Sequence, residues 1–295
     1  MVAARVEATL AERVGLAYAG PEEMLADLRL IRESLVAAGD HRSARGELQS
    51  LIWLVETFGF HLAELEVRQH SHVHERVLID LFEQLGPEHV ADPAAAAADA
   101  EFLDRLAREG WPRHVQPTTD IGREVLDTIR VIAWLQNRWG ERSCGRYIVS
   151  FTRRAADLAA VRALARLAGG DRPPALEVIP LFETGEDLAN APSILADLAG
   201  LTGTREHWDA RGRRIEVMVG YSDSAKDVGP ASATLTLDRA ERELVDWAAQ
   251  AEVELTLFHG RGGSLGRGGG PCTARSWPSR ADRWTAASRS PNRAR

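Results

Sequence analysis

The sequence predicts an α/β fold in which short, buried, parallel strands alternate with amphipathic helices. Two observations carry this prediction: five strand-length apolar segments recur along the chain, and helical patterns lie between them. Such alternation is typical of parallel β/α units, because a crossover helix must return the chain before the next parallel strand can begin. With 295 residues, 44% of them hydrophobic, the chain is long enough for one large domain or two small ones.

Two helices are predicted before the first strand. Residues 21–38 and 45–58 each carry an apolar stripe at helical spacing. Pro21 suits the first turn of the earlier helix, and Gly39 and Gly59 can end the two helices.

The strands and helices that follow are predicted from the same patterns. The predicted strands are 61–67, 147–151, 176–182, 215–221 and 253–258. The helical patterns lie near 73–85, 121–138, 155–168, 187–199 and 234–251. The last four strands are rich in β-branched or aromatic residues, as buried parallel strands are. The alanine-rich stretch 92–100 is compatible with a helix or with a loose connector.

Charged side chains follow four of the predicted strands. They are Arg68 after the first, Glu183 after the third, Asp223 and Lys226 after the fourth, and His259, Arg261 and Arg267 after the fifth. In β/α folds the residues beyond the carboxyl ends of the strands share one edge. Two carboxylates suit a hard divalent cation, whereas arginines and a lysine suit a multiply anionic substrate. Glycines around Arg261 and Arg267 would let backbone amides approach an anion. The set predicts metal-assisted chemistry on a small phosphorylated or carboxylated anion.

Lys226 is the only lysine among 36 basic residues. The arginine bias indicates GC-rich coding, so a retained lysine favours a role that a fixed, planar guanidinium cannot fill. The competing interpretation is a surface lysine kept by chance.

Composition excludes several classes of protein. A net charge of −7 and a pI near 5.8 argue against a general nucleic-acid binder. No apolar run approaches transmembrane length, and no signal-peptide pattern precedes the first helix. Cys144 and Cys272 are the only cysteines, which argues against a disulfide framework and favours a reducing cytoplasm.

Four long motifs resemble those of phosphoenolpyruvate carboxylases and occur in that family's order. They are 57–71 (TFGFHLAELEVRQHS), 180–192 (PLFETGEDLANAP), 217–229 (VMVGYSDSAKDVG) and 256–271 (TLFHGRGGSLGRGGGP). A weaker match covers 147–157, and the resemblance runs from about residue 22 to 271.

The resemblance implies an incomplete TIM-like (β/α) barrel with many additional helices. It also implies carboxylation of phosphoenolpyruvate with bicarbonate to oxaloacetate and phosphate, with Mg²⁺ or Mn²⁺ as cofactor. By resemblance, Glu183 and Asp223 would bind the metal, and Arg68 and Lys226 would hold the substrate phosphate. His259 and Arg261 would serve bicarbonate and the carboxyphosphate intermediate, and Arg267 would stabilise the same anions. The family is homotetrameric and cytoplasmic, and feeds the tricarboxylic acid cycle.

The chain also departs from the family's pattern. It lacks the upstream Thr-Ala-His-Pro-Thr motif, and residues 272–295 contain no Leu, Ile, Val, Met or Phe. A shift of reading frame would explain this tail. We therefore expect a helical segment at 1–58, a partial barrel at 59–271 and a frameshifted, disordered tail at 272–295. With at most five of about eight barrel strands, little or no carboxylase activity is expected from the chain alone.

Three other functions compete with this interpretation. The chain could be a catalytically dead remnant that only binds anions or partner chains, or another barrel lyase acting on phosphoenolpyruvate or pyruvate. The Arg-Gly-Gly repeats at 261–263 and 267–269 resemble RNA-binding boxes, but they are few and lack interleaved aromatic residues. His70, His72 and His74 alternate as in a zinc site, yet no cysteine or further histidine is placed to complete one, so polar loop or helix-start residues are the favoured interpretation.

Overall fold

The computed structural model describes residues 1–13, 15–220 and 230–259, with side chains for all of these except 230–234 and 259. The chain divides into two compact units. We call Met1–Leu65 together with Trp134–Gly145 the helical unit. The described residues of Glu66–Ala133 and Arg146–Arg295 form the sheet unit.

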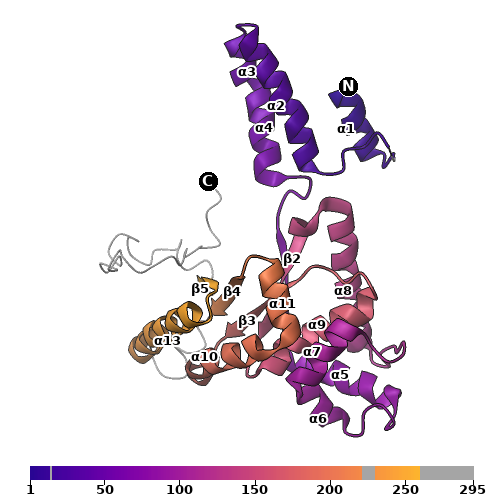
Figure 1. Cartoon of the computed structure of the whole chain (residues 1–295), viewed down its shortest axis with the longest axis vertical. Coiled ribbons are helices and arrows are strands. Elements are labelled where there is room, and N and C mark those ends of the chain that lie inside the picture. The colour runs from indigo at the N-terminus through magenta and orange to yellow at the C-terminus, as the bar shows by residue number, and fades with distance from the viewer. Residues whose placement is uncertain (14, 221–229, 260–295) are drawn as a thin grey trace. The chain divides into compact units, whose positions relative to one another are not determined.

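The helical unit is built around a pair of packed helices. Its elements are α1 (Val2–Leu10), α2 (Pro21–Ala37), α3 (His41–Arg45), α4 (Glu47–Phe58), the end of α8 (Asp120–Trp139) and the 3₁₀ helix η1 (Glu141–Ser143). Figure 1 shows α2 and α4 side by side, with α3 between them in the chain. Their apolar stripes meet in a core that includes Tyr18, Leu28 and Ile52. Pro21 begins α2 and two glutamates occupy its first turn, where the helix dipole favours acidic side chains.

The sheet unit contains one five-stranded sheet with the strand order β1-β2-β3-β4-β5. The strands are β1 (Leu65–His70), β2 (Cys144–Ser150), β3 (Glu177–Phe182), β4 (Arg214–Val219) and β5 (Glu254–His259). The pairs β2–β3, β3–β4 and β4–β5 are parallel. Consecutive strands are therefore spatial neighbours, as expected when β/α units follow one another around a common axis.

Helices cover one face of this sheet. The helices of the unit are α5 (Ser71–Leu85), α6 (Pro93–Ala98), α7 (Ala100–Glu109), most of α8, α9 (Ala155–Gly169), α10 (Gly185–Gly200), α11 (Thr202–Ala210) and α13 (Pro230–Gln250). Tyr147, Phe182 and Val217 share the covered face and are at most 1% exposed. Helices α9 and α10 pack against β3, and α13 packs against β5 (Figure 1). None of the described helices is long and apolar enough to span a membrane.

The opposite face is concave. The strand register places Arg146, Glu216, Met218 and Phe258 on this face. Arg146 on β2 lies with its guanidinium carbon 5.9 Å from the ring centre of Phe258 on β5. Arg68 on β1 reaches Met218 on β4, with Nη2 3.1 Å from Sδ. In a flat sheet these third-neighbour strands would stand about 14 Å apart, so the sheet must curl towards this face.

The predicted α/β class is confirmed, with corrections to its elements. The first strand begins at Leu65 rather than at residue 61, because Gly59 ends α4 at φ +52 and the chain then turns, with Leu62 at φ +63. The alanine-rich stretch forms α6, capped by Asp92, whose side chain accepts the N–H groups of Ala94 and Ala95. Four helices of ten residues or fewer were not predicted, because so short a segment shows few turns of apolar periodicity: α1, α3, α7 and α11.

Candidate functional site

The carboxyl ends of β3, β4 and β5 lie at one level. Phe182 pairs with Val219, and Val219 pairs with His259. The N–H of Gly220 donates a 2.8 Å hydrogen bond to the carbonyl oxygen of Phe182. Because these strands are parallel, Glu183, Gly220 and His259 lie at a single edge of the sheet.

Glu183 is half-buried at this edge, and its backbone is fixed by the start of α10. Thr184 caps the helix: its hydroxyl accepts the N–H of Asp187 at 3.1 Å, and Asp187 Oδ2 accepts the N–H of Thr184 at 3.0 Å. This reciprocal capping box satisfies N–H groups that the first helical turn leaves open. It holds Glu183 in place between strand and helix.

Gly220 packs directly against Glu183. A Cβ atom at position 220 would lie 3.0 Å from the Cα of Glu183 and 3.3 Å from the carbonyl oxygen of Phe182. The close approach of the two strand ends therefore depends on glycine at this position.

Arg68 lies within β1, two residues before its end, and not after it as the sequence suggested. Its side chain extends over the concave face to Met218, which pairs with Leu181, two residues before Glu183. Within the described part of the chain, this exposed guanidinium forms no salt bridge, and the thioether of Met218 is its hydrogen-bond acceptor. Its positive charge is thus available at the edge where Glu183 lies.

A second arginine on the same face is neutralised. Arg146 binds Glu216 through two hydrogen bonds, Nε to Oε2 at 2.7 Å and Nη2 to Oε1 at 3.1 Å. The side chain of Arg146 is 27% exposed and that of Glu216 is 20% exposed. Bidentate pairing of this kind is among the stronger ionic contacts, and partial burial reduces its screening.

Comparisons with known proteins identify the family of the chain. The family model described as phosphoenolpyruvate carboxylase matches residues 2–276. The chain belongs to the phosphoenolpyruvate carboxylase family. It is 40% identical over 278 residues to the phosphoenolpyruvate carboxylase of Xanthomonas euvesicatoria, covering 92% of this chain and 30% of that relative.

Two further relatives, both named phosphoenolpyruvate carboxylase, give the same result. The chain is 39% identical over 263 residues to that of Roseiflexus castenholzii, covering 86% of this chain and 28% of the relative. It is 37% identical over 269 residues to that of a Synechococcus strain, covering 88% of this chain and 25% of the relative. The chain therefore spans less than a third of the length of these relatives.

Of the residues predicted for the family's chemistry, the structure describes three. Arg68 and Glu183 belong to the concave face and its carboxyl edge, and His259 is the last residue of β5 at that edge. Asp223, Lys226, Arg261 and Arg267 lie outside the described residues. The predicted 272–295 tail lies there as well.

The described residues alone supply one of the two predicted metal ligands. No group of three or more His, Cys, Asp or Glu side chains comes together within them. The half-buried carboxylate of Glu183 has the hard oxygen donors that Mg²⁺ and Mn²⁺ prefer, so the donor chemistry fits the family's metal at this one position.

The three alternating histidines are used separately. The Nδ1 atom of His70 accepts the N–H of His72 at the start of α5, and His72 pairs with Glu75 at 3.1 Å. His74 is fully buried and shares a 2.9 Å hydrogen bond with the hydroxyl of Tyr147. His70 and His72 are therefore helix-start residues.

Sequence reasoning missed Arg146, Glu216 and Met218. The available signal was one charged side chain inside each of two apolar strands, Gly-Arg-Tyr-Ile-Val and Ile-Glu-Val-Met-Val. A charge in the middle of a buried strand needs a partner on the same face.

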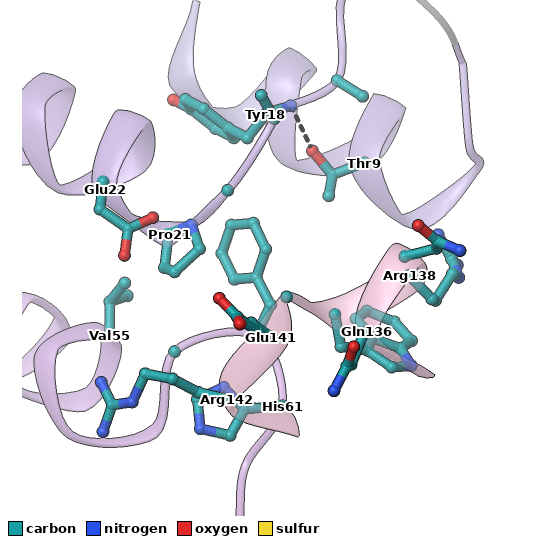
Figure 2. Close-up of a pocket in the computed structure, with 18 of the residues that line it drawn as sticks. Thr9, Tyr18, Pro21, Glu22, Val55, His61, Gln136, Arg138, Glu141 and Arg142 are labelled. Atoms are coloured by element: carbon teal, nitrogen blue, oxygen red, sulfur yellow. Dashed lines mark hydrogen bonds between the residues drawn. The ribbon is translucent and has the colours of Figure 1, made fainter. Parts of the chain in front are cut away.

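The helical unit contains a cavity of about 660 Å³ that is a second candidate for binding. Figure 2 shows Pro21 and Val55 on one side of it and Gln136 and Arg138 on the other. Two of its arginines are engaged by carboxylates: Arg138 with Glu12 at 2.7 Å, and Arg142 with Glu64 at 2.6 Å. A third arginine of the cavity, Arg13, is exposed and forms no salt bridge among the described residues.

Proposed function

We propose that this chain supplies part of the active site of a phosphoenolpyruvate carboxylase. The reaction would be carboxylation of phosphoenolpyruvate with bicarbonate to oxaloacetate and phosphate. The observation that carries the proposal is Arg68, an exposed guanidinium without a carboxylate partner among the described residues, directed over the concave face towards the edge that bears Glu183. Family membership supports the choice of reaction.

The proposed architecture is an incomplete TIM-like (β/α) barrel. Its support is the five-stranded sheet, in consecutive order, that curls enough for side chains on third-neighbour strands to touch. A complete barrel of this type has about eight strands, with the active site at the carboxyl ends. We propose 59–271 as the partial barrel, 1–58 as a helical segment before it and 272–295 as a disordered tail.

Glu183 and Asp223 would hold the divalent ion. Gly220 packs against Glu183, and the backbone from position 220 to 223 can span at most about 11 Å, so the second carboxylate is within reach of the same ion. Mg²⁺ or Mn²⁺ bound there would polarise substrate oxygens and offset negative charge.

The chain's cations would bind and orient the substrates. Arg68 and Lys226 would hold the phosphate, so that bicarbonate can attack phosphorus while the P–O bond to the enolate breaks. His259 and Arg261 would hold bicarbonate and then carboxyphosphate, and Arg267 would stabilise the same anions. Carboxyphosphate releases CO₂ and phosphate, and the enolate attacks CO₂. Fixed cations in a water-poor site stabilise both anions without reorganisation.

The assembly and the compartment are proposed from the family. A homotetramer in the cytoplasm feeding the tricarboxylic acid cycle is the expected setting. We propose that the 295 residues by themselves bind the metal and the substrate but turn over little, because a partial barrel leaves one side of the site open to water.

Metal titration tests the proposal. Electron paramagnetic resonance of Mn²⁺ with the purified chain should show one site, whose affinity falls at least about tenfold in Glu183→Gln. Glu186→Gln, an exposed acid in the first turn of α10, is the matched control and should bind as the unchanged chain does.

Substrate measurements separate the competing functions. Phosphoenolpyruvate should bind only when Mn²⁺ is present, and any product formed with labelled bicarbonate should be oxaloacetate. Binding of phosphoenolpyruvate without turnover, even at high protein concentration, would indicate a remnant that only binds anions. The absence of both Mn²⁺ and phosphoenolpyruvate binding would overturn the proposal.

A further inference from the structure

The concave face carries two arginines with opposite surroundings. Arg146 is held by both oxygens of Glu216, whereas Arg68 contacts the sulfur of Met218. Glu216 and Met218 are alternate residues of β4, so their side chains project from the same face. Alternate residues of a strand lie about 7 Å apart, within the range that a long arginine side chain can sweep.

We propose that Arg146 is a positioning residue that keeps Arg68 available for substrate by occupying Glu216. This inference rests on the proposed role of Arg68 as an anion ligand. Glu216 is the carboxylate that neighbours Met218 along β4 on this face, so it lies where it could neutralise Arg68.

Burial makes the competition for Glu216 strong. The Glu216 side chain is only 20% exposed, so a lost cation cannot be replaced fully by water. Phe258 adds to the hold on Arg146, because the guanidinium carbon lies 5.9 Å from the ring centre, inside the range of cation–π attraction. Without Arg146, the nearby exposed guanidinium of Arg68 would be drawn to Glu216.

The predicted consequence has a specific rescue. In Arg146→Met, Arg68 shifts to Glu216, and the affinity for phosphoenolpyruvate with Mn²⁺ falls roughly tenfold, as expected for loss of one charge-assisted contact. In the double variant Arg146→Met/Glu216→Gln, Glu216 no longer competes for Arg68 and the affinity returns. If Arg146 had only a structural role, the double variant would not regain affinity for phosphoenolpyruvate when its stability equals that of Arg146→Met.

Arginine modification tests the inference without any substrate. Phenylglyoxal reacts with accessible guanidinium groups, and peptide mapping by mass spectrometry reads each position separately. Arg42, an exposed residue of α3 in the helical unit, serves as the internal reference. Relative to Arg42, Arg68 should react roughly tenfold more slowly in Arg146→Met and at the original rate in the double variant.

A conservative variant keeps the test decisive if Arg146→Met does not fold. Arg146→Lys keeps the charge but cannot bind both oxygens of Glu216, so Arg68 should react several-fold more slowly than in the unchanged chain. Unchanged reactivity of Arg68 in both single variants would overturn the inference. Protection of Arg68 in these variants, together with no phosphoenolpyruvate binding by the unchanged chain, would support the inference and reject the proposed function.

Discussion

The concave face of the sheet unit and the cavity of the helical unit both contain arginines, but the side chains around these arginines differ. In the cavity, Arg138 and Arg142 are matched with carboxylates at 2.7 and 2.6 Å, and Arg13 forms no salt bridge among the described residues. On the concave face, Arg146 is matched with Glu216, yet Arg68 meets only the sulfur of Met218 among the described residues. The concave face differs in also bearing Glu183, whose carboxylate could hold a divalent cation beside an anion bound by Arg68, and we therefore place the anion site there. The size of a cavity does not by itself indicate a ligand.

The largest expected effect is on stability, and it distinguishes the partly buried Arg146–Glu216 ion pair from the more exposed Arg142–Glu64 ion pair. Arg146→Met leaves the half-buried Glu216 without its cation and should lower the free energy of unfolding by roughly 2–3 kcal/mol. Arg142→Met breaks a pair whose arginine is 66% exposed and should cost at most about 1 kcal/mol. Urea denaturation measures both. Equal losses would remove the distinction between the two regions.

The next effect is on ligand binding. Arg68→Gln should weaken phosphoenolpyruvate binding with Mn²⁺ by roughly 10- to 100-fold, because hydrogen bonds to charged groups contribute about 1.5–3 kcal/mol. Arg142→Gln, in the cavity of the helical unit, should change the affinity less than about twofold. Calorimetric titration measures the affinity of both variants for phosphoenolpyruvate. A larger loss of affinity in Arg142→Gln than in Arg68→Gln would place the anion site in the helical unit.

The helix-covered face of the same sheet differs from the concave face in containing a buried histidine, His74, that should make stability depend on pH. Burial lowers the pKa of His74 to about 3, so the folded chain keeps it neutral while the unfolded chain protonates it. The unfolded state binds the extra proton below about pH 6.5, so stability falls as pH drops from that value towards 3. Between pH 7 and pH 5 this one group should remove about 2 kcal/mol.

Denaturation at the two pH values measures this loss. His74→Gln should lose about 2 kcal/mol less than the unchanged chain on going from pH 7 to pH 5. His72→Gln is the control, since that side chain is 64% exposed. If His74→Gln and His72→Gln lose stability equally, His74 is not the group that burial keeps neutral.

The smallest expected effect concerns the packing of the strand ends. Gly220→Ala would place a methyl group 3.0 Å from the Cα of Glu183, and this overpacking should cost about 1–2 kcal/mol and weaken Mn²⁺ binding several-fold. Gly185→Ala meets nothing within 4 Å and should leave Mn²⁺ binding unchanged. Comparable Mn²⁺ affinities in the two variants would mean that the Gly220 contact does not position Glu183.

The sequence predicted the α/β class and four strands to within three residues at either end, because buried parallel strands are continuous apolar runs between helices. It misplaced β1, which is mostly exposed and polar and so lacks that signal. Arg68 was predicted to be an anion ligand from its motif, but its place inside β1 and its reach to Met218 depend on the curl of the sheet. No local pattern encodes a contact between third-neighbour strands.

The Arg146–Glu216 ion pair was not predicted either, because it also joins strands that are not adjacent. Its partners come from strands separated by β3, and 70 positions of sequence lie between them. In contrast, the capping box at Thr184 and Asp187 can be read directly from neighbouring residues. Local chemistry is visible in the sequence, whereas charge pairing across a curved sheet appears only once the strand order and register are known.

Anomalous diffraction from crystals grown with Mn²⁺ and phosphoenolpyruvate would test the central claim most directly. The account predicts a manganese peak at the carboxylate of Glu183, with a ligand oxygen within hydrogen-bonding distance of the Arg68 guanidinium. Manganese bound away from Glu183, or a phosphate held in the cavity of the helical unit while Arg68 stays on Met218, would contradict it.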